Sequence, residues 1–377
     1  MRLRSAANVI VVIVTLGLTT AHGQSSGTNT HNGASGKAWW FAVSGDSRNC
    51  GDVVMPAIAK QAREGGASFY WHLGDFRAIY DFDQDFRQTH PKANISDYET
   101  SAWPDFIEQQ LTPFGDIPVY LALGNHETIS PKTRDDAIQQ FADWFGAPEI
   151  KNQRLKDDPH AHALKTYYHW IKAGVDFVSL DNASDDQFDG SQLTWIAAEI
   201  ARAATDPEIR TLVVGMHKAL PDSISSGHSM NDSAAGTASG RSVYNQLVDF
   251  RTQTGKNVYV LASHSHFAMD NVYNTACRRQ HPNTILPGWI VGTAGAVRYR
   301  LPADVSGANQ ANTDVYGYLR GEVHPDGTVQ FRFTQLNEAD VPNETKQTYT
   351  NDFVKSCFAG NSSSYVPAGP PLPPNCP

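Results

Sequence analysis

The stretch IPVYLALGNHE, residues 117–127, runs from an apolar segment directly into Gly124, Asn125, His126 and Glu127. A short apolar run rich in aliphatic residues predicts a buried strand that ends where the polar residues begin. Amide oxygen and imidazole are groups that bind divalent cations. The stretch therefore predicts an α/β protein with its chemistry at the end of a strand.

The same pattern recurs along the chain, because further apolar runs end in metal-binding residue types. Runs that predict strands occur at 39–45, 68–75, 175–181, 211–217 and 257–266. Helical segments are predicted between them, at 53–65, 103–111, 136–145 and 192–204. The candidate ligands at the strand ends are Asp46, Asp75, Asn125, His217, His264 and His266. Ligands bind beyond the carboxyl ends of strands in open α/β sheets, so we expect these side chains to converge on metal.

Two late segments, 288–296 and 316–336, also have the composition of strands. The Pro-Asp-Gly sequence at 325–327 is a turn signal inside the second segment and predicts a hairpin. We expect these strands to complete a second sheet that faces the first.

Composition limits the class of protein. The chain has 377 residues, enough for one large domain or two small ones, and its 40 % hydrophobic content is sufficient for a core. The net charge of −9 gives no indication of a nucleic-acid-binding surface. After the N-terminal region no stretch is apolar enough to predict a stable membrane span.

The two ends of the chain are predicted to lie outside the folded domain, which covers 38–336. Residues 1–23 combine a basic start with a short apolar run, as in a signal peptide, with an uncleaved anchor as the alternative. Residues 24–37 read as a flexible leader, and 337–377 as a C-terminal extension with a Pro-rich tail. We therefore expect an exported protein, either periplasmic or secreted.

The four cysteines are Cys50, Cys277, Cys357 and Cys376. Their number is even and export leads to oxidising conditions, so two disulfides are expected. Three pairings are possible. The pairing favoured by the sequence is Cys357–Cys376, which staples the tail, together with Cys50–Cys277.

The order of the motifs resembles that of the calcineurin-like metallophosphoesterases, which include the purple acid phosphatases. The matching motifs are Gly45-Asp46, Gly74-Asp75, Gly124-Asn125-His126-Glu127, His217 and His264-Ser265-His266. The resemblance covers 38–336 and is most specific at the intact Gly-Asn-His-Glu motif. It implies a metallophosphoesterase domain with a four-layer α/β/β/α sandwich, in which two mixed sheets face each other between flanking helices.

The resemblance also implies roles for the candidate residues. Asp75 is expected to bridge two metals. Asp46 and His266 are expected to complete the first site, and the remaining ligands, Asn125, His217 and His264, the second. The family uses Mn, Zn or Fe, so one or two such ions per chain are expected. His126 is implied to lie beside the phosphate, with Glu127 orienting it.

The activity implied by the resemblance is that of a phosphatase, a hydrolase that cleaves a phosphate ester by attack of a metal-bound hydroxide on phosphorus. His126 is expected to donate a proton to the leaving group or to bind the phosphate. The substrate class, monoester, diester, nucleotide or phosphoprotein, stays open, and so does the oligomeric state.

The sequence departs from the family pattern at the first site. Arg48 stands where the family has a histidine ligand, and arginine does not bind a cation. The purple acid phosphatases use a tyrosine elsewhere, but that position is Ala78 here, and Tyr80 lies two residues further on. Ser263 replaces a glycine and Lys218 replaces a second histidine of many relatives. Arg48 either contacts the phosphate or forms a structural ion pair.

Arg48 also motivates an alternative function, an exported, non-catalytic phosphate-binding or sensor protein that retains one metal site. Other candidates are weaker. His160, His162 and His169 are read as solvated or hydrogen-bonded, with a place in the substrate pocket as the alternative. Arg298, Tyr299 and Arg300 follow a Gly-rich strand end, and the two arginines are read as part of a polar face, with substrate contact as the alternative.

Two further segments have open interpretations. The acidic run 81–85 is read as a solvated loop or helix start, since it lacks the calcium-binding pattern of an EF-hand. The segment His228 to Arg241 is read as a loop after His217, either a lid over the site or a disordered stretch.

Overall fold

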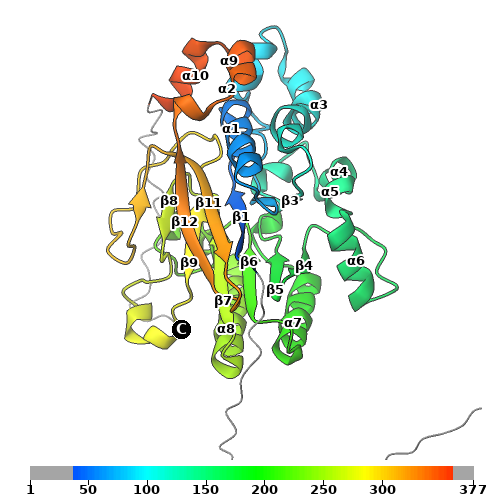
Figure 1. Cartoon of the computed structure of the whole chain (residues 1–377), viewed down its shortest axis with the longest axis vertical. Helices are drawn as coiled ribbons and strands as arrows, with labels where there is room; N and C mark the ends of the chain where they lie inside the picture. The colour runs from blue at the N-terminus through cyan, green and yellow to red at the C-terminus, as the bar shows by residue number, and fades with distance from the viewer. Residues whose placement is uncertain (1–36, 360–377) are drawn as a thin grey trace, which may run out of the picture. The chain divides into compact units, whose positions relative to one another are not determined.

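The computed structural model describes residues 37–359, in which two β-sheets are flanked by helices (Figure 1). The predicted signal peptide, nearly all of the predicted leader and the Pro-rich tail lie outside the described residues. Within 37–359, no helix is long and apolar enough to cross a membrane.

The first sheet has five strands and begins with β1, the apolar run that opens the domain. Its spatial order is β12 (Val329–Leu336), β11 (Tyr316–Val323), β1 (Trp39–Ser44), β2 (Tyr70–His72) and β3 (Val119–Leu121). The neighbours β1, β2 and β3 are parallel, whereas β11 is antiparallel to both β1 and β12. The carboxyl ends of the three parallel strands therefore lie on one edge.

The second sheet has seven strands within the described residues. Its order is β10 (Ala311–Asn312), β8 (Ala268–Asp270), β9 (Gly288–Val291), β7 (Asn257–Ala262), β6 (Thr211–Gly215), β5 (Val175–Ser179) and β4 (Tyr168–Lys172). The strands β5, β6, β7 and β9 are parallel, and β4, β8 and β10 pair antiparallel to their neighbours. Both sheets are mixed, as the sequence predicted.

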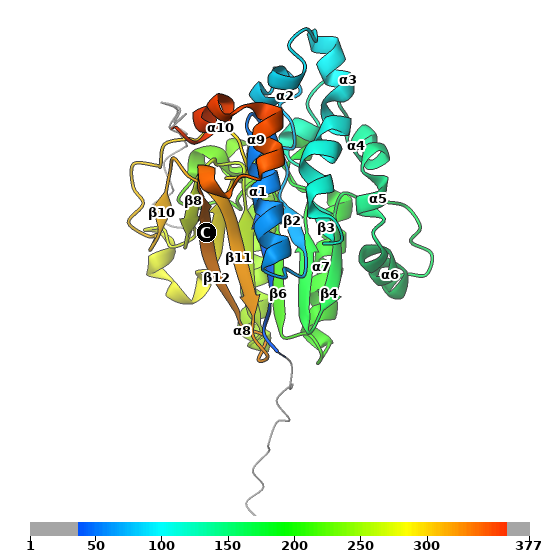
Figure 2. The same ribbon diagram turned by 45° about the horizontal axis from the view of Figure 1, so that its top comes forward.

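Helices flank the two sheets (Figures 1 and 2). Their bounds are α1 (Gly51–Glu64), α2 (Gln84–Thr89), α3 (Ile95–Phe106), α4 (Arg134–Gln140), α5 (Ala142–Phe145), α6 (Pro148–Asp157), α7 (Gly190–Thr205), α8 (Ala234–Thr254), α9 (Asn343–Tyr349) and α10 (Asn351–Phe358). The helices α4, α5 and α6 lie to the side of β3 and β4 (Figures 1 and 2). The helices α7 and α8 lie side by side against the second sheet, and α1 lies against the first.

Alternation along the strands shows why four layers form. Phe41 in β1 belongs to the same buried cluster as Phe177 in β5, so these side chains fill the space between the sheets. The next residue in each strand points the other way: Ala42 joins a cluster with α1, and Val178 joins one with α7 and α8. Successive strand side chains face opposite sides of a sheet, so each sheet has two buried faces. The predicted α/β/β/α sandwich is confirmed.

The placement of the late strands corrects one expectation. The segment 288–296 does contribute β9 to the second sheet, but the hairpin 316–336 forms β11 and β12 of the first sheet. In its register Val323 lies opposite Trp39. The parallel strands leave one edge of β1 free of partners, and the late hairpin covers that edge.

The disulfide pairing favoured by the sequence is wrong. Cys50, at the start of α1, is bonded to Cys357 in α10. The helix α9 lies beside α1 (Figure 2), and α10 continues from it, which brings the two sulfur atoms together. Cys277 is disulfide-bonded as well, and Cys376 lies outside the described residues.

The acidic run 81–85 is a helix start whose Asp81 is exposed, but Asp83 and Asp85 are not solvated as expected. Asp83 and Asp85 are fully buried around the guanidinium of Arg77, which also contacts Asp52 and Asp105. The backbone N–H of Asn49 donates to Asp83 Oδ1 at 2.8 Å. This cluster fixes the loop after β1 to the loop after β2.

The segment His228 to Arg241 is also more ordered than predicted. Residues from Ala234 onward form the first turns of α8, and Ser233 caps them by accepting a hydrogen bond from the Gly236 N–H at 2.9 Å. A serine directly before a helix is the signal that identifies this start.

Candidate metal centre

Three of the predicted ligands lie at strand ends in the same unusual backbone conformation. Asp46 after β1, Asp75 after β2 and His264 after β7 have φ angles of 60°, 60° and 64°. Side chains other than glycine rarely adopt this left-handed region, which costs roughly 1 kcal/mol or more per residue. The surrounding contacts hold all three there, and the sharp turn aims each side chain beyond the edge of its sheet.

Two glycines allow the loops after β2 and β3 to touch. A Cβ atom on Gly74 would lie 2.3 Å from the backbone nitrogen of Gly124, and one on Gly124 would lie 2.2 Å from Asp75 Oδ1. Both distances are too short for a Cβ atom and an atom to which it is not bonded. The Gly-Asp and Gly-Asn motifs therefore each need glycine in order to bring Asp75 and Asn125 together.

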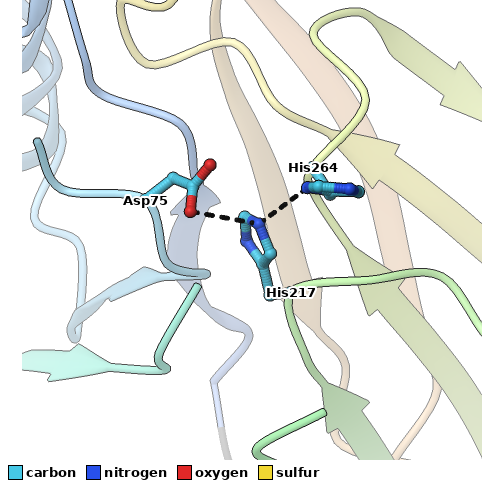
Figure 3. Close-up of side chains that lie close together, drawn as sticks. All are labelled: Asp75, His217 and His264. Atoms are coloured by element: carbon cyan, nitrogen blue, oxygen red, sulfur yellow. Dashed lines mark hydrogen bonds and ion pairs between the residues drawn. The ribbon is translucent and has the colours of Figure 1, made fainter. Parts of the chain in front are cut away.

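Four donor atoms from four strand ends meet at His217, which follows β6. Its Nε2 lies 3.3 Å from Asp75 Oδ1, 3.1 Å from Asn125 Oδ1 and 3.0 Å from His264 Nδ1. Figure 3 shows Asp75 and His264 on opposite sides of His217. Ligand atoms about 2.0–2.1 Å from a tetrahedral zinc ion are separated from each other by about 3.3 Å. The donors therefore fit a divalent cation in both chemistry and spacing.

Hydrogen bonds behind His217 determine which of its nitrogens is available to a cation. Its Nδ1 lies 2.8 Å from the carbonyl oxygen of Leu73, and a carbonyl only accepts, so Nδ1 carries the proton. Nε2 is then the nitrogen available to a metal. The hydroxyl of Ser263 also lies 3.1 Å from Nδ1 and donates to the same carbonyl.

The charge of the centre favours a cation. Burial acts to raise the pKa of Asp75, but His126 and His217 outweigh burial and hold that pKa well below its usual value. Burial opposes protonation of His217, yet Asp75 outweighs it and raises the pKa of His217 to about 9. Two fully buried carboxylates, Asp46 and Asp75, thus draw positive charge into the site.

The ligands predicted for the first site, Asp46, Asp75 and His266, also lie together and are called the first ligand group below. His266 Nε2 lies 3.2 Å from Asp46 Oδ1, and the backbone N–H of His264 donates to Asp46 Oδ2 at 2.8 Å. Arg48 reaches into this group: its Nη2 lies 3.1 Å from His266 Nε2, and its Nε lies 3.8 Å from Asp75 Oδ2. This group therefore contains an organic cation from the chain itself.

His126 lies on the other side of the same guanidinium. Its Nε2 lies 2.7 Å from Arg48 Nη1, and its Nδ1 lies 2.7 Å from the carbonyl oxygen of Ala78. Burial lowers the pKa of His126 to about 4. The carbonyl fixes the proton on Nδ1, so Nε2 accepts from Arg48. Tyr80, 58 % exposed, lies over the His126 ring with the ring centroids 5.1 Å apart.

Glu127 has a role that the sequence reasoning missed. Its Oε2 accepts from the backbone N–H groups of Gly124 and Asp75 at 2.7 and 2.8 Å, and its Oε1 accepts from that of Phe76 at 2.8 Å. Instead of orienting His126, the carboxylate ties the two ligand loops together. The signal is local, because a Glu three residues after the start of a helical turn is the capping-box position.

The rim of the centre contains residues from the segment after His217. Lys218 Nζ lies 2.6 Å from Asp186 Oδ1 and 3.5 Å from Asp232 Oδ2. The ring of His228 stacks on His264 with the centroids 4.4 Å apart. This part of the segment therefore forms a wall of the site.

Tyr299 stacks on the His266 ring with the centroids 3.9 Å apart, whereas His169 and Arg298 are held by groups outside the two sets of candidate ligands. His169 is buried between Asp157, at 2.6 Å, and Asp176, at 2.9 Å. Arg298 is buried and donates to the carbonyl oxygens of Asp314 and Cys357. Both are hydrogen-bonded structural groups. His160 and His162 lie in the loop between α6 and β4.

Comparisons with solved structures find several similar chains. A structure of PhoD has a TM-score of 0.50 at 14 % identity, covering 87 % of this chain and 78 % of PhoD. A dimetal phosphatase from Danio rerio has a TM-score of 0.47 at 11 % identity, covering 75 % of this chain and 92 % of its own. GAP50 of Plasmodium, described as the anchor in the inner membrane complex, has a TM-score of 0.45 at 12 % identity. The match covers 88 % of this chain and 99 % of GAP50.

No curated protein matches the sequence. Residues 40–268, more than half of the chain, match the profile of the calcineurin-like phosphoesterases. This range contains every predicted ligand, and the order of the motifs within it is that of the family. The chain therefore belongs to the calcineurin-like phosphoesterase family.

Proposed function

We propose that this protein is an exported hydrolase that cleaves phosphate esters with the help of bound metal, either Mn, Zn or Fe. The observation that carries the proposal is the convergence of Asp75, Asn125 and His264 on Nε2 of His217. Membership of a phosphoesterase family supports a phosphoester hydrolase in general. When bound at these atoms, a cation acts as a Lewis acid toward a phosphoryl oxygen and lowers the pKa of water to about 7.

The residues of the chain supply positioning and charge. The Nε of Arg48 is buried and has no hydrogen-bond partner within residues 37–359. A guanidinium N–H is a strong donor to phosphate oxygens, so Arg48 is proposed to hold the substrate and to stabilise charge that develops on it. Arg48, which stands where the family has a histidine ligand of the first site, is thus a proposed catalytic residue.

His126 is proposed to act with Arg48. A proton donor needs a proton on the nitrogen that faces the substrate, but Nε2 of His126 accepts from Arg48. The contacts of His126 therefore support positioning of the guanidinium, with Ala78 holding the ring in place. Because His126 lies directly beside the guanidinium of Arg48, a phosphate that binds to Arg48 is also proposed to contact His126.

Export is proposed from the N-terminal sequence, and the Cys50–Cys357 disulfide is consistent with an oxidising compartment. N-terminal sequencing of protein recovered from the culture medium or the periplasm tests this proposal. A chain that starts near residue 24 is expected, whereas recovery of the intact chain from the cytoplasm contradicts export.

Activity is tested with an aryl phosphate after loading with Mn, Zn or Fe. Both His217→Ala and Asn125→Ala remove a donor atom and are expected to lower kcat/KM at least about 100-fold. His162→Ala is the matched control, because that histidine is exposed in a loop, and it is expected to keep full activity. Absence of turnover with every metal, from acid to alkaline pH, contradicts the proposal.

A second candidate function, a binding or sensor protein without turnover, is favoured by one observation. Arg48 is held by His126 and by His266 of the first ligand group, so a fixed guanidinium of the kind that binds phosphate stands where the family has a ligand. Tight binding of phosphate to the metal-loaded protein without hydrolysis of a panel of mono- and diesters identifies this function.

A further inference from the structure

The first ligand group holds a guanidinium in the space between its carboxylates and its histidine. We infer that Arg48 takes the place of the first cation, so that the protein binds one metal ion per chain, at Asp75, Asn125, His217 and His264. The inference rests on the metal site of the proposed function but not on hydrolysis. According to this inference, the guanidinium of Arg48 occupies the place where related enzymes are expected to hold their first metal ion.

The contact between Arg48 and His266 excludes an ion directly. His266 Nδ1 lies 2.6 Å from the carbonyl oxygen of Val297 and therefore carries the proton, which leaves the lone pair on Nε2. Arg48 Nη2 lies 3.1 Å from that Nε2. An ion bound to the same lone pair would lie about 2.0–2.1 Å from Nε2 and so only ~1 Å from the arginine nitrogen. One lone pair serves one of the two partners.

Arg48 is held in this position from a second side. His126 presents its Nε2 lone pair to Arg48 Nη1 at 2.7 Å, because Ala78 fixes the proton on the other nitrogen. The side chain of Arg48 is 9 % exposed and that of His126 is 6 % exposed. Two rings, each fixed by a backbone carbonyl, thus orient one guanidinium, so the arginine is built into the site.

The charges also favour a single ion. Asp46 and Asp75 are buried and bring two negative charges, while Arg48 keeps its proton at every accessible pH. With one divalent ion the group has a single net positive charge, which suits an anionic ester. A second divalent ion would be repelled by the buried guanidinium beside it. Within the described residues, the two ligand groups contain no carboxylate besides Asp46 and Asp75 to offset this repulsion.

Metal content of the full-length protein tests the inference. After reconstitution with Mn²⁺ and removal of excess, we expect about one ion per chain by elemental analysis. The electron paramagnetic resonance spectrum should show the hyperfine pattern of an isolated Mn²⁺ ion. Two ions per chain, or the signal of an exchange-coupled pair, overturns the inference but leaves the proposed function intact. No bound metal overturns both.

Three variants sharpen the test. His266→Ala is expected to keep the ion, because His266 serves Arg48, whereas His217→Ala is expected to lose it. Loss of the ion in His266→Ala contradicts the inference. Arg48→His restores a ligand and removes the competing cation, so a second ion and an exchange-coupled spectrum are expected.

A folded Arg48→His protein that still binds a single ion contradicts the idea that Arg48 excludes the second. Circular dichroism and thermal unfolding establish that each variant is folded. If Arg48→His does not fold, the spectrum of the wild-type protein and the comparison of His266→Ala with His217→Ala still decide the question.

Discussion

At the scale of single residues, Glu127 shows how one buried side chain can fix the loops of a candidate metal centre without being one of the candidate ligands. It accepts three backbone N–H groups from two loops, those of Gly124, Asp75 and Phe76. Buried N–H groups without partners cost about 1–3 kcal/mol each, so Glu127 stabilises the loops that place Asp75 and Asn125.

Glu127→Gln keeps the size of the side chain but replaces one oxygen with an N–H donor. The amide oxygen can keep the two N–H groups that share Oε2, but the N–H of Phe76 then faces a donor. We therefore expect a loss of about 1–3 kcal/mol in unfolding free energy. Chemical denaturation measures this loss. Glu64→Gln, in an exposed position on α1, is the matched control and is expected to change stability by less than about 0.5 kcal/mol. Equal stability of the two variants contradicts the assigned role.

At the scale of helices and strands, a charged network joins α6, β4, β5 and α7. His169 in β4 lies between Asp157 of α6 and Asp176 of β5, with Glu199 of α7 at 3.1 Å. Arg202 completes the network through its contacts with Asp176 and Glu199. Burial opposes protonation of His169, but Asp157 and Asp176 outweigh it and raise its pKa to about 9.

The raised pKa of His169 predicts a pH-dependent contribution to stability. The folded-state pKa of about 9 exceeds the unfolded value of about 6.5, so protonated His169 stabilises the fold fully below pH ~6.5. The contribution, about 3 kcal/mol, is lost as pH rises through ~9. The difference in unfolding free energy between the wild type and His169→Asn should shrink by that amount between pH ~6 and ~10.

His162→Asn serves as the control for this titration, because His162 is exposed. Its stability is expected to follow that of the wild type at every pH. A difference between the wild type and His169→Asn that is constant over the whole range contradicts the raised pKa.

The sequence predicted the elements and the meeting of the candidate ligands better than it predicted the partners of those side chains. The ends of β2 and β3 are encoded locally, by an apolar run followed by Gly-Asp or Gly-Asn, so Asp75 and Asn125 could be named as candidates without a structure. The partner of Arg48 was not predictable, because His126 and His266 reach it from distant parts of the chain. The burial of Asp83 was missed for the same reason, since the charge that balances it comes from Arg77.

At the scale of the whole molecule, the end of the described chain is fastened to its beginning. The Cys50–Cys357 disulfide has a sequence separation of 307 residues. Cys50 N–H also donates to the carbonyl oxygen of Arg48 at 2.8 Å, so the cross-link lies next to the loop that carries the first ligand group. The helix α10 therefore braces this loop.

Removal of this cross-link is expected to destabilise the protein strongly. In the chain-entropy description a disulfide that closes a long loop contributes about 3–5 kcal/mol, so Cys50→Ala combined with Cys357→Ala should lower the unfolding free energy by that amount. Denaturant titration measures the loss. Ser356→Ala, at an exposed position in the same helix, is the control. A loss below ~1 kcal/mol shows that the packing of α9 and α10 suffices without the bond.

The pairing of β1 with β11 has a consequence for how the protein is made. Trp39 pairs with Val323, so the first strand to leave the ribosome lacks its antiparallel neighbour until most of the chain has been synthesised. Contacts between such distant residues slow folding, and the waiting strand edge is open to wrong partners. A nascent chain truncated before residue 316 is therefore left with an unfinished sheet and is a natural client for chaperones.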